Sequence, residues 1–114
     1  MTDEARKWLF DAREACDAIA GFVGGRGFAD YKASALLRAA TERKFEIIGE
    51  ALGKLRQRAP EVFDRIVDGH AIVGLRNRLI HGYDSVDDAI VWDVIQRKLP
   101  ALRAEMDRLL ERPG

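Results

Sequence analysis

The sequence predicts an all-α protein, and three observations support this fold class. Apolar residues recur at steps of three and four along most of the 114 residues, no segment alternates apolar and polar residues as a strand does, and only three prolines are present. A chain of this length forms one hydrophobic core, so a single domain over residues 1–114 is expected. We therefore predict an antiparallel four-helix bundle with one short extra helix.

The first helix is predicted over about residues 3–23. Thr2 can cap its amino end, and the acidic pair Asp3 and Glu4 suits the positive end of the helix dipole. The apolar stripe of this helix comprises Trp8, Leu9, Ala12, Ala15, Cys16, Ile19 and Phe22. The glycine-rich run 24–27 should end the helix; it could instead cradle a phosphate, but no strand precedes it.

A second, longer helix is predicted from Asp30 or Tyr31 to Arg58. Gly49 weakens it locally, and a glycine at such a position often permits the close approach of another helix. The apolar positions that keep helical spacing in this segment are Leu36, Leu37, Ala40, Phe45, Ile48, Leu52 and Leu55. They predict that one face of the helix lies in the core.

Two shorter helices should follow. Pro60 stands where a proline is accepted, just before a short helix over residues 61–68. A further helix is predicted from His70 to Ile80 or His81, with Gly82 as its stop signal.

The last helix is predicted over about residues 86–110. Ser85, with Asp88 three residues later, resembles a capping box that uses aspartate in place of glutamate. Pro100 should kink the helix, because proline cannot donate a backbone hydrogen bond.

Composition narrows the class of protein. Basic and acidic side chains both number 19, so the net charge of zero gives no argument for a nucleic-acid partner. The single cysteine, Cys16, excludes an intrachain disulfide, and no run reaches the ~20 apolar residues of a membrane span. The amino terminus is acidic and lacks the apolar core of a signal peptide, so the cytoplasm is the expected location.

Residues 74–83 are not easily explained as scaffold. This segment places two arginines, an amide, a histidine and a phenol near the end of a helix. Asn77 and Arg78 are both helical neighbours of His81, at spacings of four and three. Arg76 lies five residues before His81, about 140° around the helix, so the two converge only if the arginine reaches round or the helix ends near Ile80.

These residue types suit RNA cleavage without a metal. An imidazole can take the proton of the ribose 2′-hydroxyl or return one to the leaving 5′-oxygen near neutral pH, and a guanidinium can stabilise charge on the phosphate. Asn77 and Tyr83 can donate hydrogen bonds to the phosphate or the histidine. Because the reaction needs both a base and an acid, a two-fold dimer that brings two copies of His81 together is expected.

Simpler interpretations remain open. The polar residues of the motif could form a solvated helix face, and His70 is interpreted as an ordinary residue at a helix start. Trp8 and Trp92 lie on apolar stripes, which favours the core over base stacking. Two histidines and one cysteine far apart in sequence give little support for zinc, and no cofactor is expected. Several basic residues lie around the second helix, where they could serve solubility or contact RNA phosphates: Arg38, Arg43, Lys44, Lys54, Arg56 and Arg58.

The motif resembles that of HEPN domains, written R-x4-6-H, and more narrowly the R-x4-H-x-Y form of the HepT branch. Arg76, His81 and Tyr83 match this pattern. Segments 45–51, 84–92 and 99–100 also resemble parts of the same family, so the likeness covers most of the chain. The resemblance implies a metal-independent ribonuclease and a helical two-fold dimer with the motif in a cleft between protomers. It implies that Arg76 and His81 are catalytic and that Asn77 and Arg78 assist.

The same resemblance implies a partner. Members of the family are toxins paired with a minimal nucleotidyltransferase antitoxin of the MntA type, which transfers AMP from ATP to the motif tyrosine, here Tyr83. Added negative charge and bulk at that position should repel RNA. The alternative is a non-catalytic helical module that docks a nucleotidyltransferase, and a third possibility is a structural helical adaptor. Messenger RNA and transfer RNA both stay open as targets.

Overall fold

The computed structural model describes residues 1–82 and 86–111, and within these ranges it contains seven helices and no strand. The predicted all-α class is confirmed. The helices are α1 (Asp3–Val23), α2 (Phe28–Ala33), α3 (Ala35–Arg58), α4 (Pro60–Phe63), α5 (Gly69–His81), α6 (Asp88–Arg97) and α7 (Leu99–Glu111). There are more helices than predicted because each of the two longest predicted helices is divided.

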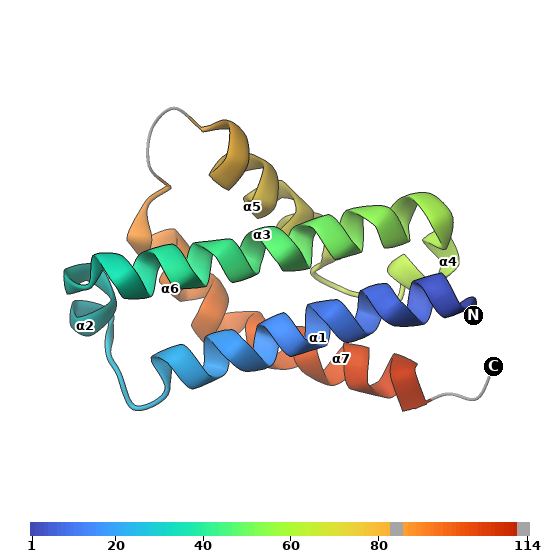
Figure 1. Ribbon diagram of the computed structural model, residues 1–114, viewed down its shortest axis with the longest axis horizontal. Helices are drawn as coiled ribbons and strands as arrows, with labels where there is room; N and C mark the ends of the chain where they lie inside the picture. The colour runs from blue at the N-terminus through green and yellow to red at the C-terminus, as the bar shows by residue number, and fades with distance from the viewer. Residues whose placement is uncertain (83–85, 112–114) are drawn as a thin grey trace.

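The long helices α1 and α3 lie side by side and run in opposite directions (Figure 1). Helix α7 packs against α1, α5 packs against α3, and the short helices α2 and α6 contact each other at one end of the molecule. The buried apolar core lies between these helices, and its largest fully buried side chains are Tyr31, Phe45, Phe63, Leu9, Ile19, Ile48, Leu52, Leu55, Ile72, Leu102, Met106 and Val91. Helix α5 is therefore held in the molecule by its packing against α3.

Helix α1 forms as the sequence predicts. The Thr2 hydroxyl oxygen accepts a hydrogen bond from the backbone N–H of Ala5 at 3.1 Å, which caps the helix. At the other end Gly25 adopts a φ of 74°, a left-handed conformation that glycine reaches without steric cost. Cys16 is 1% exposed, as expected for a buried thiol, and burial raises its pKa to about 12.

The predicted second helix is wrong at its amino end. The helix is interrupted at Ser34, whose backbone is extended (φ −110°, ψ 106°). The hydroxyl oxygen of Ser34 caps α3 by accepting a hydrogen bond from the N–H of Leu37 at 3.1 Å. Residues 28–33 form α2 instead. Because of this interruption, the first turns of α3 present a different face to the rest of the molecule. Thr41 is buried there, whereas Leu36 is 81% exposed. Serine ends one helix here because it caps the next.

The predicted short helix is also shorter than expected. Helix α4 has only four residues: it begins at Pro60 and ends at Phe63. The apolar side chain of Val67 is 84% exposed, and its backbone N–H donates to the carboxylate Oε2 of Glu105 at 3.0 Å. A side chain of α7 therefore satisfies the backbone group that a longer helix would have paired.

The predicted last helix is divided into α6 and α7. Helix α6 ends before Lys98, and Pro100 lies in the first turn of α7. A residue in the first turn donates no hydrogen bond within the helix, so the missing N–H of proline costs nothing there. The amino-terminal cap of α6 is Asp87, whose carboxylate accepts from the N–H of Ala89 at 2.8 Å. The helix thus begins at Asp88, two residues later than predicted, and the predicted cap Ser85 lies outside the described residues. In the part of the chain that the structure describes, no helix has the length and apolar character of a membrane span.

Candidate active site

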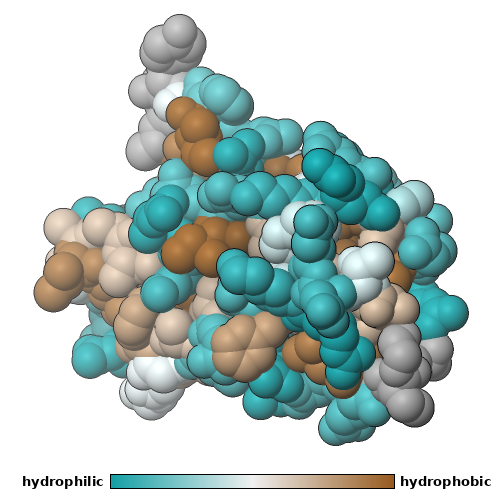
Figure 2. All heavy atoms as spheres, turned by 45° about the vertical axis from the view of Figure 1, so that its right-hand side comes forward, coloured by the Kyte–Doolittle hydropathy of each residue, from teal (hydrophilic) through white to brown (hydrophobic). Residues whose placement is uncertain are grey.

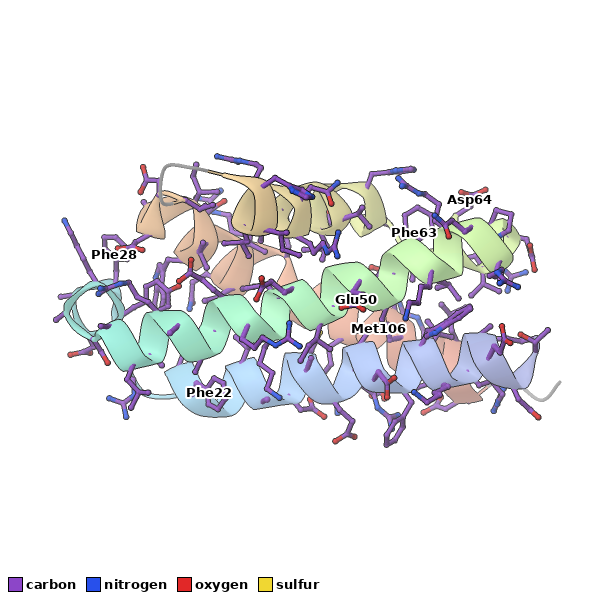
Figure 3. All side chains as sticks on the ribbon, turned by 45° about the horizontal axis from the view of Figure 1, so that its top comes forward. Phe22, Phe28, Glu50, Phe63, Asp64 and Met106 are labelled. Atoms are coloured by element: carbon purple, nitrogen blue, oxygen red, sulfur yellow. The ribbon has the colours of Figure 1, made fainter. Side chains whose placement is uncertain are left out.

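The first half of α5 is fixed to the rest of the molecule by buried residues. Gly69, Ile72, Val73 and Leu75 are all buried. Gly69 lies so close to Phe63 that a Cβ atom at Gly69 would stand 2.8 Å from the phenyl ring. The ring of His70 packs edge-on against the same phenyl ring, with 4.9 Å between centroids, and His70 is the second residue of α5, in agreement with its interpretation as a residue at a helix start. These contacts anchor the start of α5 on Phe63, which is labelled in Figure 3.

Arg76 lies against a glycine of α3. A Cβ atom built on Gly49 would overlap the Cβ of Arg76, and it would lie 2.7 Å from the Cγ of Arg76 and 3.3 Å from the carbonyl oxygen of Ile72. Only a residue without a side chain permits this approach. The sequence correctly indicated Gly49 as a point of helix contact, and the structure shows that Arg76 is the side chain it accommodates.

Among the described residues, the guanidinium of Arg76 has a hydrogen-bond partner but no carboxylate partner. Its Nη1 donates to the Oδ1 of Asn77 at 3.2 Å, while its Nε is buried and has no hydrogen-bond partner among the described residues. A guanidinium has five N–H donors in a planar fork that matches two phosphate oxygens. Arg76 therefore keeps donors available for a ligand.

Arg76 also lines a groove between α3 and α5. It has a volume of ≈ 310 Å³ and is lined by Gly49, Glu50, Gly53, Lys54, Arg56, Gln57, Val73, Arg76 and Asn77. Three of the lining side chains are cationic and one is anionic, so the groove favours a negatively charged ligand. Glu50, one of the lining residues, lies in the second half of α3 and is labelled in Figure 3.

The second half of α5 is largely uncovered. Asn77, Arg78 and His81 are exposed, and Ile80 is 41% exposed. In Figure 1 this end of the helix projects away from α1 and α3. Figure 2 shows apolar surface beside hydrophilic surface on the same projection.

The structure brings together some of the predicted site residues. Arg76 and Asn77 are hydrogen-bonded, and the carbonyl oxygen of Arg78 accepts from the N–H of Gly82 at 2.9 Å. His81 is the last residue of α5, so the helix does not end early at Ile80. His81 therefore lies about 7.5 Å farther along the axis than Arg76 and on a different side of the helix. Tyr83 lies outside the described residues.

Other residues of the groove were not predicted as part of the site. Lys54 and Arg56 appeared only among basic residues spread around a helix, and Gly53 and Gln57 carried no expectation. The spacing of Gly49 and Gly53, four apart on one helix face, is the signal that could have indicated a groove there. Within the described ranges, no three histidine, cysteine or carboxylate side chains cluster as ligands for a metal ion.

Comparison with known proteins agrees with the motif. Residues 12–109 match the family model described as Ribonuclease HepT-like. The chain is 31% identical to "Putative RNase TTE0752" of Caldanaerobacter subterraneus subsp. tengcongensis, over 94% of this chain and 95% of the relative. It is 28% identical to "Probable ribonuclease HepT" of Thermococcus cleftensis, over 96% and 98%. No solved structure is significantly similar to it. The helical fold, the motif and these matches together show that this chain belongs to the HepT-like ribonuclease family.

Proposed function

We propose that this chain is a metal-independent endoribonuclease, with Arg76 and His81 as its catalytic residues, and that it acts as the toxin of a toxin–antitoxin pair. The observation that supports this most strongly is the position of Arg76. Its stem is packed against Gly49, and Arg76 lines an open groove that contains two further cationic side chains. A guanidinium fixed at the edge of such a groove is suited to bind a phosphate.

The proposed chemistry is an attack of the ribose 2′-oxygen on the adjacent phosphorus. An imidazole takes the proton of the 2′-hydroxyl as the new P–O bond forms, and the P–O5′ bond breaks. A second imidazole, protonated, gives its proton to the leaving 5′-oxygen. The products are a 2′,3′-cyclic phosphate and a 5′-hydroxyl. The Arg76 guanidinium stabilises the extra negative charge of the phosphorane, and Asn77 orients that guanidinium.

The reaction needs two proton-transferring groups, and each chain offers one histidine in the motif. We propose that a two-fold homodimer supplies the second. The uncovered end of α5 supports this, because Ile80 and His81 are both exposed there. In such a dimer the ends of the two α5 helices meet. Arg76 of one protomer can then approach His81 of the other, although within each protomer these two residues lie on different sides of α5.

The test is cleavage of single-stranded RNA by the purified protein in EDTA. Wild type should cleave and leave 2′,3′-cyclic phosphate ends, whereas a strand with 2′-deoxyribose at every position should stay intact. His81→Ala should lower the rate by about two to four orders of magnitude, which is typical of removing a general acid or base. His70→Ala, a matched change of the other histidine on α5, should keep most of the activity. If wild type and His81→Ala are equally inert on every RNA, the chain is instead a docking module for a nucleotidyltransferase.

Control of the toxin is proposed to act through Tyr83. In this proposal a minimal nucleotidyltransferase antitoxin transfers AMP to the phenol. The phenolic oxygen attacks the α-phosphorus of ATP, pyrophosphate leaves, and the phenolic proton goes to solvent. The added phosphate is attached two residues after His81 in the sequence, where its charge repels RNA. Tyr31, the other tyrosine of the chain, is fully buried and so cannot reach a second protein.

A further inference from the structure

The groove beside Arg76 continues along α3, beyond the residues of the motif. Helix α5 runs against the direction of α3 (Figure 1), so residues later in α3 lie beside residues earlier in α5. Lys54 and Arg56 stand about 7.5 and 10.5 Å along the axis from Gly49, at the side away from His81. Arg76 thus lies between the exposed histidine and two further cations.

The groove is open because of a second glycine. A Cβ atom at Gly53 would meet no atom within 4 Å, in contrast to Gly49, where Arg76 fills the space. Lining groups at this end include the ammonium of Lys54, the guanidinium of Arg56 and the amide of Gln57. Within the described residues the counter-ion of Lys54 is Glu50, at 3.8 Å with both side chains about half exposed, which is a weak pair.

From this arrangement we infer that the α3–α5 groove, lined by Gly53, Lys54, Arg56 and Gln57, binds the RNA strand next to the cleaved phosphate. The inference rests on the proposed ribonuclease activity and adds a substrate-binding surface to it. Lys54 and Arg56 contact successive phosphates of the strand, and the Gln57 amide hydrogen-bonds to a ribose or phosphate oxygen. A single strand suits a groove of ≈ 310 Å³ better than a duplex, since its backbone can bend to follow the lining cations.

The test uses a fluorescent single-stranded RNA that carries 2′-O-methyl groups throughout, so that it binds without being cleaved. Gly53→Gln should place a side chain in the empty groove and weaken binding roughly tenfold, comparable to the removal of one charge-assisted hydrogen bond. The double change Lys54→Gln with Arg56→Gln should weaken binding and reduce the salt dependence. The log–log slope should fall by about 0.7 for each phosphate that the variant no longer neutralises.

Two matched variants serve as controls. Gly21→Gln makes the same change at a helical glycine of α1 that is equally open. Arg97→Gln removes one positive charge from α6, which does not line the groove. Both should bind RNA as wild type does. Thermal unfolding of Gly53→Gln should occur at the same or a higher temperature, because glutamine favours a helix more than glycine. A weaker affinity for RNA therefore reports on the groove.

The outcomes separate the two proposals. If wild type cleaves ordinary RNA and the groove variants bind the uncleavable strand with wild-type affinity and salt dependence, the groove inference is wrong and the ribonuclease remains. If wild type neither cleaves nor binds any RNA, the proposed function fails and the groove inference falls with it. Weaker binding by both groove variants, with unchanged binding by both controls, supports the inference.

Discussion

Arg76 keeps its position because a residue on another helix has no side chain. Gly49 admits the stem of Arg76, and Asn77 accepts a hydrogen bond from its guanidinium. The motif explains which residue types act, but these neighbours determine where the guanidinium lies. The two tyrosines also differ in their surroundings. Tyr31 is enclosed between helices and packs against Trp92, whereas Tyr83 comes two residues after the exposed end of α5 in the sequence.

This difference between the tyrosines gives a prediction at the residue scale. Incubation of the chain with its cognate nucleotidyltransferase and ATP should add one or more AMP groups, measured by intact mass. Tyr83→Phe should add none, because phenylalanine has no oxygen to attack the α-phosphorus. Peptide mapping should leave Tyr31 unmodified. An equal mass increase in Tyr83→Phe would show that another residue accepts the AMP.

The ends of the helices depend on local capping residues more than on apolar periodicity. Thr2, Ser34 and Asp87 each accept a backbone hydrogen bond at the first turn of a helix. Ser34 also divides what the apolar spacing predicts as one helix. Periodicity continues across such breaks because both helices contribute to the same core, so it cannot locate them. The capping side chains do locate them, since each satisfies N–H groups that a helix start leaves unpaired.

The contact between α3 and α5 gives a prediction at the element scale. Gly49→Ala should destabilise the protein by roughly 1–3 kcal/mol, because the new methyl group overlaps Arg76 and the helices must separate. Gly53→Ala, four residues later on the same helix, should stabilise it by up to about 1 kcal/mol, because its methyl group meets open space. Urea unfolding of the two variants measures both changes. Equal effects of the two substitutions would contradict the close approach at Gly49.

The whole molecule is elongated, with extents of 44 × 31 × 19 Å, and the carboxyl end of α5, where His81 is the last residue, projects from it. If Arg76 and His81 act on one phosphate, as we propose, the site is incomplete within one chain, because the two residues lie on different sides of α5. Proximity of reacting groups contributes strongly to catalysis, so a second copy that brings these groups together would complete the site. In the proposed dimer, the exposed Ile80 would contribute apolar surface to that contact.

Subunit mixing tests this at the scale of the assembly. Wild type and His81→Ala, mixed in equal amounts under conditions that exchange subunits, should give about one quarter of the all-wild-type activity, because only wild-type pairs carry both histidines. Independent subunits would give about one half instead. Sedimentation should show one dimeric species for the mixture and for each pure protein, and a monomer that cleaves RNA at full rate would contradict the two-histidine mechanism.

The order of residues was enough to predict the all-helical class, the bounds of α1, the approach of a helix at Gly49, and the motif that leads to the HepT-like ribonuclease family. These depend on local periodicity, on capping and on residue types within a short segment. The packed helices were needed to establish that Leu36 and Val67 are exposed, that Arg76 lies against Gly49, and that Lys54 and Arg56 extend the same groove. Each of these depends on which helices pack together, and side-chain contacts between distant segments leave no periodic trace in the sequence.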